Sequence, residues 1–361
     1  MALHGILLAG GPGTRFWPWS RSGLPKPFLP IASSAPLLRE TASRILPLVS
    51  PSRLWVVTHR SLVPRARRLL RGLRGCRILG EPRSRNTAAS IGVAAALAAR
   101  EDVDATLAVL PSDHWVRPPS EFARALRAGA EVAGEGFLVL FGIRPTAPAT
   151  GYGWVRRGRG SGRARGLRVF EVAGFHEKPD RRRALAYLRS GLYHWNSGAF
   201  VFRADAILEE IGTCLPTLAR RLARLRGADR RTERRAFEAV FRDAPAVSID
   251  RGVLERSSRL RVVEPRFRWS DVGSWSSLDE LLRRDGVTNL VRVPGGRGFV
   301  GIDARRCLIW SSLPHLVAAV GVEDLVVAHT PDATLICPRS RAEEVREVVE
   351  AIRRRGWRRV L

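Results

Sequence analysis

The alternation of apolar and polar positions divides the sequence into two parts. In the first part, short apolar runs end at turn residues and are separated by segments of helical character. The apolar runs lie at residues 6–9, 54–58, 77–79, 105–110, 137–143, 169–175 and 195–202. The helical segments lie at residues 36–49, 62–73, 87–99 and 218–241. This order predicts an α/β fold, a parallel sheet covered by helices, with sites beyond the carboxyl ends of the strands.

From residue 288 onward the chain consists of short β-rich pieces separated by turn residues at near-regular spacing. The pieces lie at residues 299–303, 307–310, 316–320, 325–328 and 333–336. They predict a small β domain, followed by a closing helix over residues 341–354. We therefore divide the chain into a larger α/β domain, residues 1–284, and a C-terminal β domain with the closing helix, residues 285–361.

The composition is that of a globular protein without a membrane span. Hydrophobic residues make up 45% of the chain and charged residues 26%, and no apolar stretch is long enough to cross a bilayer. The first residues lead directly into a strand, without the basic and apolar regions of a signal peptide. We therefore expect a cytoplasmic protein with no membrane partner. Four scattered cysteines indicate neither a zinc site nor a disulfide framework.

The net charge of +27 raises nucleic acid as a partner, but the distribution of the charge argues against it. The basic residues are spread along the chain, and the densest run, residues 156–168, contains no aromatic residue. Of the 61 basic residues only Lys26 and Lys178 are lysine, which indicates a bias in codon composition. We expect no nucleic-acid partner, an exposed hairpin loop over residues 156–168, and a field that gathers anionic substrates.

The first apolar run ends in a glycine-rich loop, Gly10-Gly11-Pro12-Gly13-Thr14. Glycines let consecutive backbone N–H groups face an anion, and Arg15 and Lys26 add positive charge. The Walker pattern fails because Gly-Lys-Ser/Thr is missing, and the dinucleotide fingerprint fails because Phe16 replaces its third glycine. The segment predicts a third kind of phosphate loop, and the alternative is an ordinary turn after a strand.

Two carboxylates at strand ends are candidates for chemistry. Asp113 follows a central apolar run and is well placed for a divalent metal that faces phosphates; the alternative is a cap of the next helix. Glu81 follows the third run, and its carboxylate can accept hydrogen bonds from N1–H and N2–H₂ of guanine. Asn86 and Thr87 are expected to cap the Ala-rich helix, whatever else they do.

Later loops carry polar groups suited to a sugar phosphate. Glu177 and Asn196 can bind sugar hydroxyls, and Lys178 can bind a phosphate. The alternative for Glu177 and Lys178 is a surface ion pair, and the alternative for Asn196 is a turn residue. The glycines on both sides of Tyr152 indicate backbone close to a ligand, or a turn between strands.

Together these segments resemble one family, the sugar-1-phosphate nucleotidyltransferases. The stretch Leu8-Ala9-Gly10-Gly11-x-Gly13-Thr14-Arg15-x-Trp17-Pro18-x-Ser20-Arg21, then Pro25-Lys26-x-Phe28, is similar to the opening of the mannose-1-phosphate guanylyltransferase branch. Further matches are Glu81-Pro82-x-x-Arg85-Asn86-Thr87-Ala88, Pro111-x-Asp113-His114, Phe175-x-Glu177-Lys178-Pro179, Trp195-Asn196-Ser197-Gly198 and Trp269-Ser270-Asp271-Val272-Gly273. The resemblance covers nearly the whole chain, strongly to Trp275 and weakly after it.

The resemblance implies a Rossmann-like, mixed, mostly parallel sheet flanked by helices, with a partial left-handed β-helix after it. It implies transfer of GMP from GTP to mannose 1-phosphate, giving GDP-mannose and pyrophosphate, with Mg²⁺ or another divalent cation held by Asp113 and Asp271. The implied catalytic residues are Arg15, Lys26, Asp113, Lys178 and Asp271. The implied nucleotide-binding residues are Leu8, Ala9, Gly10, Gly11, Gly13, Thr14, Arg15, Lys26, Glu81, Asn86, Thr87, Ser112 and Asp113. The implied sugar-phosphate-binding residues are Gly151, Tyr152, Glu177, Lys178, Asn196 and Asp271.

One segment departs from the family pattern. Ser248-Ile249-Asp250 is similar to the start of the family's Ser-Ile-Asp-Tyr-x-(Val/Ile)-Met-Glu-Lys, but the residues after it differ, so the local shape of the sugar pocket does not follow from the resemblance. The departures are Arg251, Gly252, Leu254 and Arg256.

Two alternatives to the implied function are kept. The first is the same chemistry on another sugar 1-phosphate, such as a heptose or glucose phosphate. The second is a non-catalytic sugar-nucleotide sensor, against which the intact Lys26, Asp113 and Asp271 argue. We expect no isomerase domain of the kind that some relatives carry, and a homodimer is left open.

Overall fold

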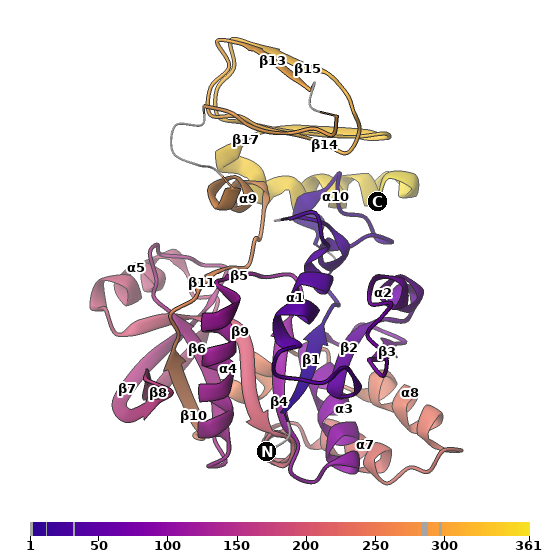
Figure 1. The fold of residues 1–361 in the computed structure, drawn as a ribbon, viewed down its shortest axis with the longest axis vertical. Helices are drawn as coiled ribbons and strands as arrows, with labels where there is room; N and C mark the ends of the chain where they lie inside the picture. The colour runs from indigo at the N-terminus through magenta and orange to yellow at the C-terminus, as the bar shows by residue number, and fades with distance from the viewer. Residues whose placement is uncertain (1–2, 12, 32, 283–287, 296–297) are drawn as a thin grey trace. The chain divides into compact units, whose positions relative to one another are not determined.

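The computed structural model in Figure 1 describes residues 3–11, 13–31, 33–282, 288–295 and 298–361. Contacts within the chain divide it into two compact units. The first unit comprises Met1–Gly10, Thr41–Ser112 and Val116–Trp269, and the second comprises Gly11–Glu40, Asp113–Trp115 and Ser270–Leu361. The predicted boundary between residues 284 and 285 lies outside the described residues and stays a prediction.

The first unit contains a nine-stranded sheet in the order β3-β2-β1-β4-β9-β6-β10-β8-β7 (Figure 1). Its strands are β1 (Leu3–Leu8), β2 (Leu54–His59), β3 (Arg77–Glu81), β4 (Thr106–Pro111), β6 (Leu138–Ile143), β7 (Gly153–Ala164), β8 (Leu167–Glu177), β9 (Tyr193–Arg203) and β10 (Leu260–Glu264). β8 and β9 run opposite to all the other strands of the sheet. The predicted mixed, mostly parallel sheet is therefore confirmed.

Two features of this sheet position the candidate sites. β1 and β4 are central strands, buried on both faces because their residues are apolar, and they pair in parallel so that Leu8 lies opposite Pro111. Their carboxyl ends therefore share one edge of the sheet. β7 pairs with β9 as well as with β8, so β9, β6, β10, β8 and β7 close into a ring of strands.

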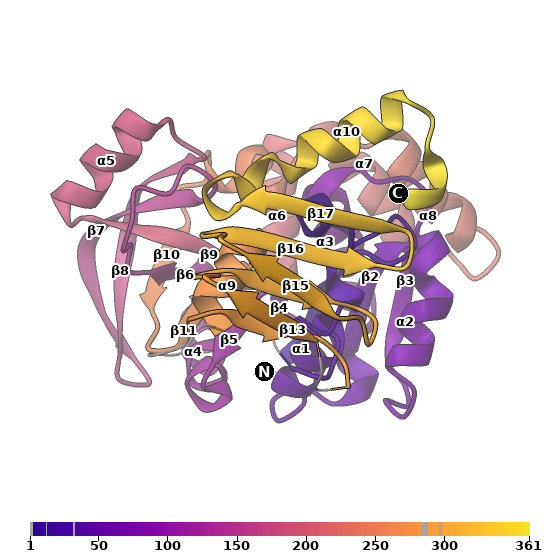
Figure 2. The ribbon, with the colours of Figure 1, turned by 90° about the horizontal axis from the view of Figure 1, so that it is seen from above.

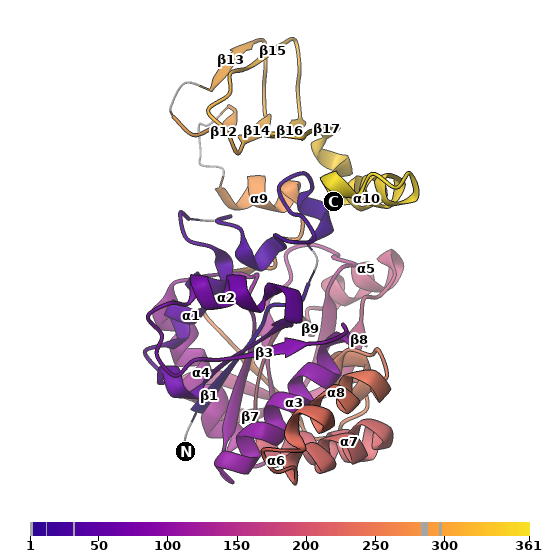
Figure 3. The same ribbon diagram turned by 90° about the vertical axis from the view of Figure 1, so that its right-hand side faces the viewer.

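Helices cover both faces of this sheet (Figure 3). On one face α3, α6, α7 and α8 share a hydrophobic core with the strands, and on the other Gly129 of α4 lies against Phe141 and Val201. A Cβ at Gly92 in α3 would lie 2.6 Å from a methyl carbon of Leu222 in α7, so the glycine allows these helices to approach. The helices of this unit are α2 (Val63–Leu69), α3 (Asn86–Glu101), α4 (Pro119–Ala133), α5 (Arg181–Ser190), α6 (Ala204–Cys214), α7 (Pro216–Arg226) and α8 (Glu233–Asp243).

Three shorter elements fall where the chain passes from one unit to the other. They are α1 (Leu37–Ile45), β5 (Trp115–Arg117) and β11 (Arg268–Ser270). Among the described residues, no helix combines the length and the apolar character that crossing a membrane requires.

The second unit contains a coil of β-strands (Figures 2 and 3). One sheet holds β12 (Leu290–Arg292), β14 (Leu308–Ser311), β16 (Leu325–Thr330) and β17 (Ala333–Pro338), and the other holds β13 (Phe299–Ile302) and β15 (Val317–Val320). From β12 to β16, successive strands alternate between the sheets and pair in parallel with the strand one coil earlier, and β17 closes the first sheet in antiparallel. The predicted β domain is confirmed, and its left-handed sense stays a prediction.

The segment that follows the glycine-rich loop shares a core with these strands. The ring of Trp19 lies 4.0 Å from that of Trp310 in β14, and the ring of Phe16 lies 5.2 Å from that of Trp275. α9 (Trp275–Leu282) and α10 (Val345–Arg354) contribute further side chains to the same cluster. The backbone around residues 13–28 is therefore held by C-terminal residues, which the local sequence of the loop does not reveal.

Three predicted elements differ from the structure. The helix predicted over residues 218–241 is two helices, α7 and α8, because Asp229 turns the chain by accepting hydrogen bonds from the N–H groups of Arg231 and Thr232. The loop predicted over residues 156–168 is paired strand on both sides of a two-residue turn, Arg165 and Gly166, which both have positive φ. The closing helix begins with a 3-10 segment, Arg339–Glu344, before α10.

Candidate active site

Leu8, Ala9 and Ser112 fix the ends of the two central strands. The N–H and the hydroxyl of Ser112 both donate to the carbonyl of Leu8, at 3.0 and 2.6 Å. The carbonyl of Ala9 accepts from the hydroxyl of Thr58 at 2.8 Å, and its N–H donates to the carbonyl of Val57. These contacts use backbone and hydroxyl groups of buried residues, so they set where the glycine-rich loop starts.

Glu81, at the end of β3, is buried beside the first glycine of the loop. Its side chain accepts a hydrogen bond from the hydroxyl of Ser90 at Oε1, and a Cβ at Gly10 would lie 3.9 Å from Oε2. Burial raises the pKa of the Glu81 carboxyl, although the Ser90 hydrogen bond opposes that shift. One carboxylate oxygen is therefore held in place, and the other faces the space that Gly10 leaves open.

Asn86 and Thr87 are the first two residues of α3. Asn86 has φ of 62°, and its side-chain oxygen accepts from the N–H of Thr87 at 2.9 Å. The hydroxyl of Thr87 instead accepts from the N–H of Ile249 at 2.9 Å. The expectation that Asn86 and Thr87 cap the helix is wrong: the N-cap position is Arg85, and among the described residues no side chain makes a capping hydrogen bond there. Thr87 instead ties the start of α3 to the segment that contains Asp250.

Within the second unit, the side chain of Lys26 contacts both predicted metal ligands, Asp113 and Asp271. Its side chain is 6% exposed, its ammonium nitrogen lies 3.1 Å from Oδ2 of Asp113, and it donates to the main-chain carbonyl of Asp271. Burial opposes ionisation of Asp113, but the charges of Lys26 and His114 outweigh it, so its pKa is lowered. The Asp113 carboxylate therefore stays ionised at neutral pH.

The loop before Lys26 requires glycine at one position. Gly13 has φ of 59°, and a Cβ there would lie 2.5 Å from the Cβ of Lys26. The hydroxyl of Ser20 donates to the Gly13 carbonyl at 2.7 Å. Gly13 thus serves the packing of Lys26 as well as the turn, and any larger residue would displace that side chain.

Arg15 lies beside Asp271 on the same unit. A Cβ at Gly273 would lie 3.3 Å from Nη1 of Arg15 and 3.0 Å from Oδ2 of Asp271, so both charged groups border this glycine. Nε of Arg15 also pairs with Glu343 at 3.0 Å, and the Arg15 side chain is 38% exposed. Among the described residues, a Cβ at Gly11 would have no heavy atom within 4 Å beyond its chain neighbours, and Thr14 directly follows Gly13.

The donor set around Lys26 suits a hard divalent cation. Asp113 and Asp271 both contact Lys26 and offer carboxylate oxygens, the ligand type that Mg²⁺ prefers. Within the described ranges, no group of three or more His, Cys, Asp or Glu side chains could hold a metal ion alone. Mg²⁺ in nucleotide sites is commonly held by one or two carboxylates together with water and substrate phosphates.

Glu177, Asn196 and Asp250 form a polar cluster within the first unit. The amide nitrogen of Asn196 donates to Oδ1 of Asp250 at 2.9 Å, and its oxygen accepts from the N–H of Gly198. A Cβ at Gly153 would lie 2.7 Å from Oε2 of Glu177 and 3.3 Å from the Cβ of Asn196. Gly153 therefore allows these two side chains to lie close together, as the pairing of their motifs predicts.

Asp250 is the member of this cluster that the sequence analysis did not assign a role. Burial, and then the neighbouring charge of Glu177, raise the pKa of Asp250 to about 6. The residue opens a single π-helical turn, Asp250–Leu254, a form often found at functional sites. The sequence feature that could have identified Asp250 is the Ser248-Ile249-Asp250 match, which lies next to the residues that depart from the family pattern.

Lys178 and Tyr152 border the cluster in different ways. The ammonium of Lys178 pairs with Oε1 of Glu177, its side chain is 55% exposed, and its N–H donates to the Tyr152 carbonyl. The ring of Tyr152 lies 5.1 Å from each of the rings of Trp195 and Trp269, in edge-to-face contacts. A Cβ at Gly151 would have no heavy atom within 4 Å, beyond its chain neighbours, in the part of the chain that the structure describes. The Lys178 side chain is thus accessible to solvent, and its backbone is joined to that of Tyr152 by a hydrogen bond.

Comparisons with known proteins agree with this arrangement. The Nucleotidyl transferase family matches residues 4–286, and the MannoseP isomerase/GMP-like beta-helix domain matches residues 297–352. The chain is 39% identical to the xanthan biosynthesis protein XanB of Xanthomonas campestris pv. campestris (strain B100), over 97% of this chain and 73% of the relative. It is 39% identical to the mannose-1-phosphate guanylyltransferase of Escherichia coli, over 96% of this chain and 73% of the relative.

A solved structure extends the likeness to the fold. The structure described as mannose-1-phosphate geranyltransferase from Thermus thermophilus superposes with a TM-score of 0.86 at 37% identity, covering 98% of this chain and 100% of that one. The family model spans well over half of the chain, and the resemblance found in the sequence motifs is confirmed. The chain belongs to the nucleotidyl transferase family, with a β-helix domain of the MannoseP isomerase/GMP-like type after the catalytic part.

Proposed function

We propose that this protein transfers GMP from GTP to mannose 1-phosphate, giving GDP-mannose and pyrophosphate. The observation that carries the proposal is the contact of one buried lysine with two aspartates, Lys26 with Asp113 and Asp271. A sensor that only binds a sugar nucleotide does not need this set, because charge neutralisation around phosphates is what the transfer reaction requires. The names of the relatives supply the base and the sugar.

The proposed reaction needs no general base. The phosphate of mannose 1-phosphate is already anionic near neutral pH and attacks the α-phosphorus of GTP in line, while the bond to the pyrophosphate breaks. The task of the protein is then to align two anions and to offset their charge. Mg²⁺ held by Asp113 and Asp271 would supply positive charge to the nucleotide phosphates.

The loop residues would act on the phosphates of GTP. The backbone of Gly10 and Gly11 leaves room for close approach of an anion, and Thr14 adds a hydroxyl. The corresponding side of Gly13 is instead filled by Lys26. Arg15 and Lys26 would stabilise the negative charge that develops on the leaving pyrophosphate. Lys26 is fixed by two contacts before any substrate binds, so its charge needs little reorganisation.

The cluster around Asn196 would bind the sugar phosphate. Glu177 and Asp250 offer carboxylate oxygens to sugar hydroxyls, and Asn196 holds Asp250 in place through its amide. Lys178, whose side chain is 55% exposed, would leave Glu177 to meet the incoming phosphate. Tyr152 would present its ring to the apolar face of the sugar, supported by Trp195 and Trp269.

Pyrophosphate release measured across four nucleoside triphosphates and a panel of sugar 1-phosphates tests the proposal. We expect the highest kcat/KM with GTP and mannose 1-phosphate, and no release without a divalent cation. Faster turnover with a heptose or glucose phosphate would replace the sugar assignment. Binding of GDP-mannose without any turnover would instead identify a sensor.

Glu81→Gln is expected to narrow the preference for GTP over ATP by roughly 1–3 kcal/mol, which is the usual cost of an unmatched buried polar group. The amide places a donor against the N–H groups of guanine, whereas Ser90 still has an oxygen to which it can donate. The measurement is the ratio of kcat/KM for the two nucleotides. Glu135→Gln, at an exposed position of the same unit, is the control. An unchanged ratio would make Glu81 a structural residue.

The KM for mannose 1-phosphate is expected to rise as the pH falls through about 6, because Asp250 then gains a proton and loses its charge. The Asp250 carboxyl is mostly ionised only above its raised pKa of about 6, so we expect the lowest KM for the sugar phosphate above this pH. The substrate phosphate also titrates near this pH. A comparison of the native protein with Asp250→Asn separates the titration of Asp250 from that of the substrate phosphate, because only the phosphate titrates in the variant. Identical pH profiles for both proteins would exclude a role for the Asp250 charge.

A further inference from the structure

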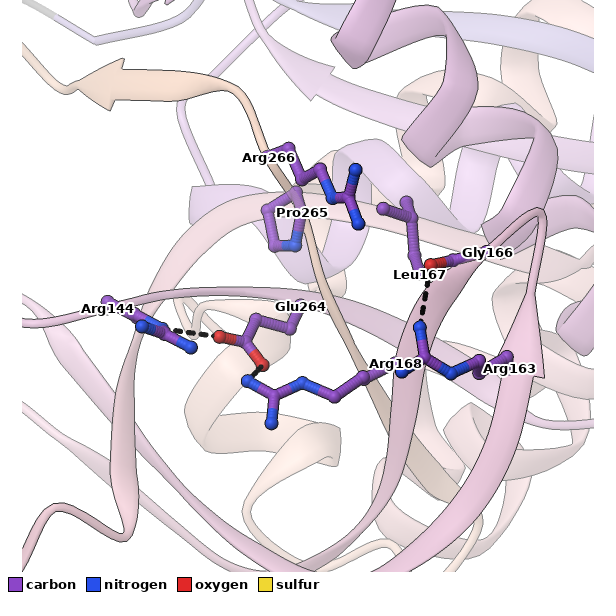
Figure 4. A pocket seen from close by; sticks show the side chains of 8 residues that line it. All are labelled: Arg144, Arg163, Gly166, Leu167, Arg168, Glu264, Pro265 and Arg266. Carbon is purple, nitrogen blue, oxygen red and sulfur yellow. Dashed lines mark hydrogen bonds and ion pairs between the residues drawn. The ribbon is translucent and has the colours of Figure 1, made fainter.

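A pocket at one mouth of the strand ring is rich in arginine and is used by none of the steps above. It lies where β6 and β10 end and where β7 turns into β8, and its volume is about 280 Å³. Its lining is shown in Figure 4 and consists of Arg144, Arg163, Gly166, Leu167, Arg168, Glu264, Pro265 and Arg266. Mouths of closed strand barrels are frequent places for ligand sites.

The pocket holds one carboxylate against four guanidinium groups. Glu264, 10% exposed, is flanked by Nε of Arg144 at 2.5 Å and Nη2 of Arg168 at 2.5 Å. Arg163 donates to the carbonyl of Gly166, and Arg266 has no hydrogen-bond or ion-pair partner among the described residues (Figure 4). The four guanidinium groups thus exceed the one carboxylate by three charges around a small cavity that is open to solvent, since the side chains of Arg144 and Arg168 are 73% and 41% exposed.

Glu264 orients the guanidinium groups of Arg144 and Arg168 but leaves most of their N–H donors free of a carboxylate partner. Each guanidinium carries five N–H donors in a fixed plane, and the contact with Glu264 uses one edge of Arg144 and one of Arg168. The nearby His194 does not add a charge at neutral pH, because burial lowers its pKa to about 4. The remaining guanidinium edges are preorganised for a multiply charged oxyanion, to which arginine binds by paired hydrogen bonds.

We propose that this pocket binds a small phosphoryl anion, of the size of pyrophosphate or a sugar monophosphate, at a place separate from the residues assigned to the reaction. The volume is near the lower end of the ~300–1,000 Å³ range of small-molecule sites, so a nucleotide sugar is too large for it. The site follows from residues that the family motifs do not include.

Isothermal titration of the full chain with inorganic pyrophosphate in EDTA tests the proposal. The pocket variant Arg144→Gln/Arg266→Gln is compared with Arg234→Gln/Arg235→Gln, a pair on α8 that removes the same charge from an exposed surface. We expect the pocket variant to weaken one binding event by about tenfold or more, and the control to change it by less than about twofold. A parallel titration with mannose 1-phosphate distinguishes pyrophosphate from a phosphate ester as the preferred ligand.

Arginine-specific labelling gives a second, local readout. Phenylglyoxal followed by peptide mass spectrometry should show pyrophosphate protecting Arg144 and Arg266 of the native chain, but not Arg234. Both pocket arginines lie outside the residues assigned to catalysis, so the pocket variant should retain pyrophosphate release in the transferase assay. Equal weakening in the pocket and control variants, or protection no greater at Arg144 than at Arg234, would overturn the proposal whether or not the transferase function holds.

Discussion

Replacing Asp113 or Asp271 by asparagine is expected to lower kcat by about 10²-fold or more, because a neutral amide binds Mg²⁺ poorly. The two variants should differ in one respect. Asp113 also balances the buried ammonium of Lys26 through its side chain, whereas Asp271 contacts Lys26 through its main-chain carbonyl. Asp113→Asn therefore removes a counter-charge as well as a ligand, and we expect it to lower the melting temperature more than Asp271→Asn does.

The measurement is kcat at saturating GTP and mannose 1-phosphate over a range of Mg²⁺ concentrations, together with thermal unfolding of each variant. Asp303→Asn, at an exposed position of the same unit, is the matched control and should keep native turnover. A loss of metal affinity predicts that excess Mg²⁺ restores part of the rate in Asp271→Asn. Near-native turnover of both active-site variants at low Mg²⁺ would remove the metal assignment.

The sequence predicted the core of the catalytic sheet because its central strands are mostly apolar on both faces, a property that does not depend on distant contacts. β1 and β4 are examples, since their burial follows from composition alone. The long helix predicted over residues 218–241 was wrong because periodicity continues across the break between α7 and α8. The break depends on the side chain of Asp229, which caps a turn, and one polar residue in a helical window does not reveal that role.

The charged hairpin shows a second limit of local patterns. Residues 156–168 have the composition of a solvated loop, and their arginines and glycines form no apolar face that would indicate strand pairing. What makes the segment a strand is its partner, since β7 pairs with β8 along its length and with β9 at its start. Strand formation there is a tertiary effect, which the local propensity of glycine and arginine opposes.

At the candidate site, motifs named residues but not their partners. Lys26 and Asp271 are 245 positions apart, and the sequence placed both near phosphates without indicating that they touch. Ser90, which holds Glu81, and Asp250, which accepts from Asn196, were not assigned roles because each gains one only through its neighbour in space. A motif match gives the type of group, whereas its orientation comes from side chains outside the motif.

The two lysines illustrate the difference most directly. In a chain whose other 59 basic residues are arginine, both lysines lie in segments that the resemblance assigns to phosphates, so the sequence treats them alike. In the structure Lys26 is 6% exposed and held on two sides, whereas Lys178 is 55% exposed and paired with Glu177. A steric reason for lysine therefore exists at Lys26, and the retention of lysine at Lys178 has no such explanation here.

Lys26→Arg is accordingly expected to lower kcat/KM by about tenfold or more, roughly 1.4 kcal/mol, although it conserves charge. The Cβ of Lys26 already lies against Gly13, and its ammonium fits between Asp113 and the Asp271 carbonyl, where a planar guanidinium would displace one of them. Steady-state rates with GTP and mannose 1-phosphate measure the loss. Lys178→Arg, which has space around it, should lose less, and Arg234→Lys on the exposed face of α8 should lose nothing measurable. A native rate for Lys26→Arg would show that the site needs only a positive charge, and the compact ammonium would then have no special role in holding Asp113 and Asp271 together.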